Sequence, residues 1–294
     1  MRRNIEQLSL DSSVNTKLIG HEVQRARLKQ MFVNNKLPST MMFAGVSGIG
    51  KRLVARELAR TLLCAANSET GPRQAVYGGC SECKNCHILD SGNCPDYYEI
   101  NCLDRDESSV EHLRELLYSL HLSTFSSKSR VIIFNDSEYL SIQGANLMLK
   151  SLEEPRRNTY FIIVCANPSR LPATLLSRCQ IWFFDTLRAE QVQAILADSK
   201  EFGDLGLTTQ EELREASLLA DGSLDNFKRL SQHREFWMQL QRMLDDIFWG
   251  NTTLASELAL DLAKDKENLN TSLQVLRTIA RQRMLSANDH DAYA

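Results

Sequence analysis

Four cysteines are spaced as ligands for a single metal ion. Cys80, Cys83 and Cys86 follow one another with two residues between neighbours, and Cys64 lies upstream at the end of a predicted helix. Thiolates are soft ligands that suit tetrahedral zinc, and the C-x2-C-x2-C spacing lets one tight loop present successive sulfurs to the same ion. The spacing therefore predicts a zinc module within residues 64–94.

Two alternatives stay open for this cluster. Cys94 competes with Cys64 for the fourth ligand position, because it follows Cys86 closely in the sequence. Close cysteine triplets also hold iron–sulfur clusters, which is the second alternative. Disulfides are not expected, because we interpret the protein as cytoplasmic, where thiols stay reduced. Residues 1–6 carry charge without a following apolar stretch, and no run approaches the roughly eighteen apolar residues of a membrane span.

A glycine-rich stretch has the pattern of a phosphate-binding loop. Residues 45–51 read G-V-S-G-I-G-K, follow a predicted strand at 41–44 and lead into a predicted helix at 52–65. In that context backbone N–H groups can cradle phosphates. The residues that would do so are Gly45, Gly48, Gly50 and Lys51. Nucleotide binding therefore stays open.

The same region lacks the residues that normally hold Mg²⁺. Arg52 stands where a Ser or Thr hydroxyl would bind the ion, and Asn135 stands where a strand-end carboxylate is expected. Asp136 could take over after a shift of register, which would leave a slow ATPase. We expect instead that the chain does not hydrolyse ATP, because metal positioning dominates the catalysis of phosphoryl transfer.

The elements that carry these residues alternate between strand and helix. Further strands are predicted at 130–134 and 160–164, and a helix at 144–152. Continuous apolar strands between helices indicate an α/β layer with a buried parallel sheet and right-handed crossovers.

Beyond about residue 187 the apolar pattern is helical throughout. Helices are predicted at 189–199, 209–220 and 236–249. We predict three domains, which are a nucleotide-binding-like core at 1–186, a small helical lid at 187–231 and a helical collar, or oligomerisation domain, at 232–294.

The composition argues against a protein that coats nucleic acid. Hydrophobic residues make up 43% and charged residues 24% of the 294 residues, and the formal net charge is −3. A zinc-dependent nucleic-acid binder is a further alternative, but residues 80–94 contain no Phe, Tyr or Trp to interleave with basic residues.

Three more motifs complete a family pattern. Residues 18–22 read L-I-G-H-E, residues 146–155 read N-L-M-L-K-S-L-E-E-P, and Ser177, Arg178 and Cys179 form an S-R-C motif. With the glycine-rich loop and the four cysteines, they make about residues 15–230 resemble the clamp-loader AAA+ subunits of bacterial DNA polymerase III. The resemblance implies an AAA+ core with a lid and a collar. It also implies a hetero-pentamer with gamma/tau-type and delta-type subunits that loads the sliding clamp onto primer-template DNA.

The departures from this family pattern indicate which subunit type the chain resembles. The gamma/tau subunit is the family's ATPase, whereas the rigid stator commonly has a degraded nucleotide site. Arg52, Asn135 and Asp225, an acid where ATP-using relatives carry a lid arginine, make the chain look like the stator. By the resemblance, Arg178 acts in trans as an arginine finger on a neighbour's ATP. The alternatives are a self-sufficient gamma-type ATPase and a merely structural Arg178.

Overall fold

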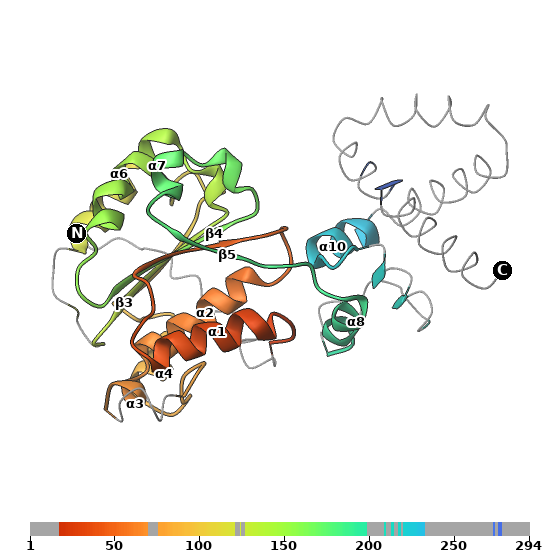
Figure 1. Cartoon of the computed structure of the whole chain (residues 1–294), viewed down its shortest axis with the longest axis horizontal. Coiled ribbons are helices and arrows are strands. Elements are labelled where there is room, and N and C mark those ends of the chain that lie inside the picture. Colours follow the sequence, from red (N-terminus) through yellow and green to blue (C-terminus); the bar gives the residue numbers. More distant parts are fainter. Residues whose placement is uncertain are drawn as a thin grey trace. The chain divides into compact units, whose positions relative to one another are not determined.

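The computed structural model divides into two compact units, Met1–Asp185 and Thr186–Ala294 (Figure 1). It describes residues 18–69, 76–120, 124, 127–198, 209, 213–214, 217–218, 220–232, 273 and 276–277.

The first unit is built on a five-stranded sheet with the strand order β2-β3-β4-β1-β5, in which all neighbouring strands are parallel. The strands are β1 Thr40–Ala44, β2 Tyr97–Asn101, β3 Arg130–Asn135, β4 Thr159–Cys165 and β5 Gln180–Phe183. Every residue of β1 and β3 is buried, as expected of inner strands that are covered on both faces. The predicted α/β class with a parallel sheet is confirmed.

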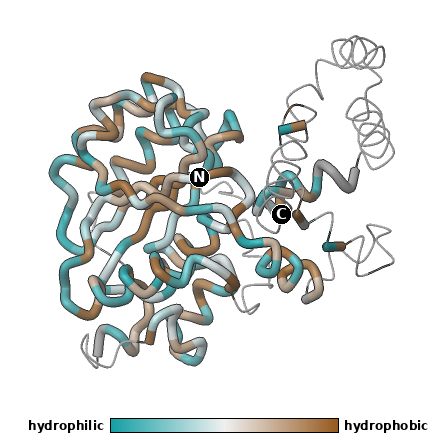
Figure 2. The backbone as a smooth tube through the Cα atoms, turned by 45° about the vertical axis from the view of Figure 1, so that its right-hand side comes forward, coloured by the Kyte–Doolittle hydropathy of each residue, from teal (hydrophilic) through white to brown (hydrophobic). Residues whose placement is uncertain are grey.

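Helices cover both faces of this sheet, and Figure 1 shows α6 and α7 on one side with α1 and α2 on the other. The helices of this unit are α1 Glu22–Val33, α2 Lys51–Leu63, α3 Ala65–Glu69, α4 Lys84–Asp90, α5 Val110–Ser119, α6 Ile142–Glu153 and α7 Ala173–Leu176, with the short 3-10 helices η3 Ser137–Tyr139 and η4 Pro168–Arg170. Figure 2 shows hydrophobic segments running through the middle of the unit.

A hydrophobic core joins one face of the sheet to three helices. Leu113 of α5, Met148 of α6 and Leu175 of α7 belong to one buried cluster with Ile132 and Phe161 of the sheet. Serine side chains begin two of these helices, because Ser109 Oγ accepts the N–H of His112 and Ser141 Oγ accepts the N–H of Gly144. The helix predicted at 144–152 therefore begins slightly earlier, at Ile142, directly after its N-cap Ser141.

A buried polar chain ties the cysteine-bearing loop to the sheet. Asn85, between two of the cysteines, donates to Leu63 O at 3.0 Å and to Ser127 Oγ at 3.2 Å. The Ser127 N–H donates to Asp96 Oδ2 at 2.8 Å, and Arg130 Nη2 lies 3.8 Å from Asp96 Oδ1. Asp96 and Arg130 are buried, so pairing offsets part of the cost of removing both charges from water.

The second unit contains α8 Ala189–Asp198 and α10 Leu224–Gln232 among the described residues. The helix predicted at 189–199 is thus present. Gly222 has a φ of 73°, and an added Cβ would lie 2.2 Å from Leu187 O, so no larger residue fits without backbone movement.

Several expectations for this unit lie outside the described residues. They are the helix at 236–249, most of the helix at 209–220 and nearly all of the collar at 232–294. Among the helices that are described, none is long and apolar enough to cross a membrane.

Candidate functional site

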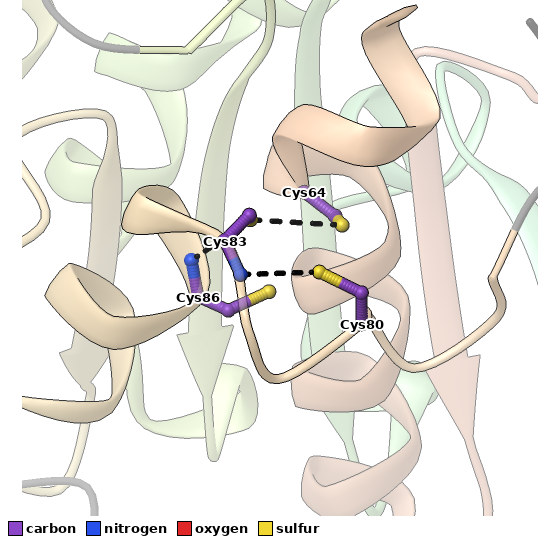
Figure 3. Close-up of side chains that lie close together, drawn as sticks. All are labelled: Cys64, Cys80, Cys83 and Cys86. Atoms are coloured by element: carbon purple, nitrogen blue, oxygen red, sulfur yellow. Dashed lines mark hydrogen bonds between the residues drawn. The ribbon is translucent and has the colours of Figure 1, made fainter. Parts of the chain in front are cut away.

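The four predicted cysteine ligands come together at one end of α2 (Figure 3). The Sγ atoms of Cys64, Cys80, Cys83 and Cys86 all lie within 4.8 Å of one another. Cys64 follows α2 with extended backbone, and Cys83 is the N-cap of α4. Within the described part of the chain, this group contains Cys64 and not Cys94.

Backbone N–H groups stabilise one of the four sulfurs as a thiolate. The N–H of Cys83 donates to Cys80 Sγ at 3.3 Å, and the N–H of Cys86 donates to Cys83 Sγ at 3.5 Å. Burial alone raises the pKa of Cys83, but the N–H groups of Cys86 and Ala65 outweigh it and lower the pKa to about 6. Burial raises the pKa of Cys64, and it raises that of Cys86 to about 12. A bound cation would offset the charge of four thiolates, and this donor set suits a tetrahedral ion.

Arg60 and a glycine pair shape the loop that precedes these sulfurs. Arg60 Nε donates to Gly78 O at 3.0 Å and Nη2 donates to Ser81 Oγ at 3.1 Å, while Nη1 pairs with Asp90. Gly78 and Gly79 have φ values of 86° and 82°, a region that favours glycine. A Cβ added to Gly79 would lie 3.1 Å from Cys86 Sγ. Sequence reasoning missed Arg60, because its partners come from a loop that only folding brings near α2.

The predicted phosphate loop connects β1 to α2. A Cβ added to Gly45 would lie 2.3 Å from Phe184 O, so glycine is required there. Gly48 and Gly50 have φ values of 72° and 96°. Lys51 Nζ donates to Gly45 O at 2.7 Å and to Val46 O at 2.6 Å.

His21, from the L-I-G-H-E motif, holds the same loop from outside. Its Nε2 lies 2.6 Å from Ile49 O, and its ring packs edge-on against Phe184. Burial lowers the pKa of His21, so the neutral ring donates a hydrogen bond to this carbonyl at pH 7.

Arg52 and Asn135 meet at a carboxylate that sequence reasoning did not single out. Arg52 Nε lies 2.5 Å from Glu99 Oε1, and Asn135 Nδ2 donates to the same oxygen at 2.7 Å. Asp136 has left-handed backbone (φ 50°) just beyond the end of β3. The signal for Glu99 in the sequence is an acid within the stretch Y-Y-E-I, which forms the edge strand β2.

Glu99 has two further partners. Arg56 Nε lies 3.2 Å from Oε1 and 2.9 Å from Oε2, and the Tyr97 hydroxyl donates to Oε2. Only 10% of the Glu99 side chain is exposed. Burial by itself raises the pKa of this carboxyl, but the guanidinium groups of Arg56 and Arg52 hold it below its ordinary value.

The S-R-C motif lies after α7 and contacts α6. Arg178 Nη2 lies 3.0 Å from Glu153 Oε2, and Nη1 donates to Thr174 O at 2.9 Å. Ser177 Oγ also donates to Thr174 O, and Cys179 Sγ donates to Leu175 O. The structure thus pairs Arg178 with a glutamate of the L-E-E-P motif on its own chain, and the role in trans stays a prediction.

The family is decided by a match over more than half of the chain. A family model described as DNA polymerase III, delta subunit matches residues 20–188. The chain belongs to this family.

Subunits of DNA polymerase III are also among the curated relatives of this chain. DNA polymerase III subunit delta′ of Pseudomonas aeruginosa is 35% identical over 136 residues, which are 46% of this chain and 39% of that protein. Subunit delta′ of Haemophilus influenzae is 25% identical over 202 residues, covering 67% of this chain and 59% of that protein. These matches support a subunit similar to delta prime, which is the stator type that the sequence departures indicated.

The tau/gamma subunit type matches as well. Subunit tau/gamma of Haemophilus influenzae is 31% identical over 180 residues, which are 61% of this chain and 25% of that protein. Because the delta prime and tau/gamma relatives match at similar identity, identity does not separate the two subunit types.

A glycine substitution tests how the loop shapes the cysteine cluster. We expect Gly79→Ala to weaken metal binding, because the added Cβ presses on Cys86 Sγ. Gly78→Ala is the matched control, since it carries a similar φ but its Cβ meets only the Glu57 side chain, at 3.6 Å. Competition with a chromophoric chelator measures the affinities. Equal affinities in the two variants would show that Gly79 does not position the sulfur.

The low pKa of Glu99 predicts a pH-dependent contribution to stability. Because its pKa lies below the ordinary 4.5, the contribution is complete above pH 4.5 and is lost as the pH falls through the folded-state value. Glu99→Gln should therefore lower the free energy of unfolding by ~1.5–3 kcal/mol at pH 7. The difference from wild type should shrink on acidification below pH 4.5.

Urea denaturation at a series of pH values measures this effect. Glu115→Gln, on the exposed surface of α5, is the control and should change little. A difference between wild type and Glu99→Gln that grows on acidification would contradict the assignment.

Proposed function

We propose that this chain is the delta prime-type stator of a DNA polymerase III clamp loader. It does not hydrolyse ATP itself and supplies an arginine finger to a neighbouring ATPase subunit, so that the sliding clamp is loaded onto primed DNA. The observation that carries the proposal is the pairing of both Arg52 and Asn135 with Glu99, at the two positions where an ATPase needs metal ligands.

The proposal includes the partners and domains that such a stator has. The partners are gamma/tau-type and delta-type subunits in a hetero-pentamer, with contact to the clamp and to primer-template DNA through the complex, in the cytoplasm. We assign the core to 1–186, the lid to 187–231 and the collar to 232–294. The chain spans 25% and 59% of the lengths of the tau/gamma and delta′ relatives from Haemophilus influenzae.

The proposed arginine finger is Arg178. Its pairing with Glu153 does not oppose this role, because the side chains are 30% and 60% exposed. An exposed ion pair contributes only about 0–1 kcal/mol. A cation that reaches the γ-phosphate of a neighbour accelerates hydrolysis by roughly 10³–10⁵-fold, which corresponds to several kcal/mol. Breaking the exposed pair would therefore cost little compared with the transition-state stabilisation that the arginine would supply.

A gamma-type ATPase is the second candidate function. The 31% identity to a tau/gamma subunit favours it. It requires ATP turnover by the isolated chain that disappears in Lys51→Ala.

We propose Zn²⁺ as the ion held by Cys64, Cys80, Cys83 and Cys86, since four thiolates in a cytoplasmic protein match its ligand preference. Purified without chelators, the chain should contain one zinc ion. Cys64→Ser should lose most of it and Cys94→Ser should keep it, because Cys94 lies outside the group. Both cysteines are buried, which makes the pair a matched comparison. Zinc retained by Cys64→Ser, or iron in its place, would contradict the assignment.

Removal of the Arg178 side chain tests the stator function. In a reconstituted complex, Arg178→Ala should leave assembly and zinc content intact but lower the ATPase of one neighbouring site by up to about 10³-fold. Arg178→Lys should restore little, because an ammonium group lacks the planar fork of a guanidinium. Single-turnover clamp loading is the measurement that reports one site most directly.

The control for this experiment is Arg157→Ala, which removes an exposed arginine of the same unit. The isolated wild-type chain should show no ATP turnover above background. A complex with Arg178→Ala that loads clamps at the wild-type rate would make Arg178 a structural residue.

A further inference from the structure

A divalent cation in a phosphate-loop site takes protein ligands from two places, the residue after the loop lysine and the end of a neighbouring strand. In this chain those places hold Arg52 and Asn135, which offer a guanidinium and a neutral amide. Both side chains turn N–H donors toward Glu99, and the one side-chain oxygen at these two positions, the neutral amide Oδ1 of Asn135, is buried and accepts no hydrogen bond. A single neutral oxygen replaces neither the hydroxyl nor the carboxylate that would bind the ion. The residues at these positions do not fit Mg²⁺.

We propose that the Arg52–Glu99 ion pair replaces the divalent cation, so that this site excludes Mg²⁺ and needs none to hold its shape. Arg52 Nε and Asn135 Nδ2 meet at one oxygen, Glu99 Oε1, at 2.5 and 2.7 Å. The guanidinium therefore lies next to both positions from which an ion would take its ligands. The anionic partner comes from β2 instead of from the end of β3.

The hydrogen-bonding capacity of Glu99 is already used. A carboxylate offers about four lone-pair positions. Oε1 accepts from Arg52, Arg56 and Asn135, and Oε2 accepts from Arg56 and Tyr97. No lone pair is left for an ion, so Glu99 cannot serve as a substitute ligand without breaking one of these contacts.

The charges near the cluster also oppose a second cation. Two guanidinium groups already face the single carboxylate of Glu99, and Lys51 lies in the adjoining loop. Of the acids that follow β3, Glu138 accepts the Ala166 N–H with both carboxylate oxygens, each at 3.1 Å. Beside Glu99, a dication would lie close to two guanidinium groups and to a carboxylate that they already pair with.

The pairing links α2 to β2 and β3 through protein groups alone. Arg52 and Arg56 come from the first two turns of α2, Glu99 comes from β2, and Asn135 ends β3. In a metal-dependent site such a link depends on the bound ion, whereas here the contacts are made by protein groups without one. The inference deepens the proposed stator function, and its relevance to clamp loading rests on that function.

Mn²⁺ is the probe that tests the exclusion, because its electron paramagnetic resonance signal reports free ion. The zinc-loaded wild-type chain should bind no Mn²⁺ at this site. Arg52→Thr combined with Asn135→Asp frees Glu99 and offers a hydroxyl and a carboxylate, so its Mn²⁺ affinity should rise at least roughly tenfold. Arg52→Thr combined with Asn135→Leu removes the same guanidinium without adding a carboxylate. Its Mn²⁺ affinity should stay below that of the restored variant.

Two results would overturn the inference. The first is that the wild type binds Mn²⁺ as tightly as the restored variant and that Asp136→Asn abolishes this binding. That result would place a working metal site on Asp136. The other is a Glu99→Gln variant whose lost stability Mg²⁺ restores. The wild-type titration decides the matter even if the restored variant does not fold. Failure of Arg178→Ala to affect clamp loading would remove the stator function and leave the Mn²⁺ result unchanged.

Discussion

Charge that is removed from water has to be paired, and in this chain one carboxylate meets that requirement for a whole site. Glu99 lies almost fully covered beside the phosphate loop, where an unpaired carboxylate would cost several kcal/mol. Arg52, Arg56 and Asn135 supply its partners from one helix and a neighbouring strand. Because the same contacts occupy the positions that an ATPase uses for its metal, structural stability and the proposed loss of hydrolysis share one cause.

The cysteine module follows the same constraint at the other end of α2. Arg60 joins the loop before the cysteines to Asp90 after them, and Asn85 joins the cluster to Ser127 and hence to Asp96. The module is therefore attached to the sheet through buried polar contacts as well as through its sulfurs. A metal ion held there would contribute its binding free energy to the folding of this unit.

A stator has to keep its shape while its neighbours change theirs. The proposed function agrees with the contacts that hold the phosphate loop. Lys51 contacts the carbonyls of residues 45 and 46, and His21 contacts the carbonyl of residue 49. The proposed finger, by contrast, is held by an exposed pair with Glu153 and by a hydrogen bond to Thr174 O. Buried contacts thus maintain the phosphate loop, and exposed ones hold the residue that is proposed to act on a partner.

The sequence by itself determined the inner strands, the α/β class, the glycine positions and the four cysteines, because each depends on local apolar pattern, turn geometry or ligand spacing. It did not predict β2 or β5, which are edge strands with half-exposed residues and little pattern. Only the tertiary structure decided that Glu99 joins Arg52 to Asn135, that Arg60 spans the cysteine loop and that Glu153 faces Arg178. The partners in these contacts are far apart in the sequence. Arg52 and Glu99 are separated by 47 residues, Glu99 and Asn135 by 36, Arg60 and Asp90 by 30, and Glu153 and Arg178 by 25. Parallel strands and their crossovers set which of them meet, and that geometry is not encoded in any one segment.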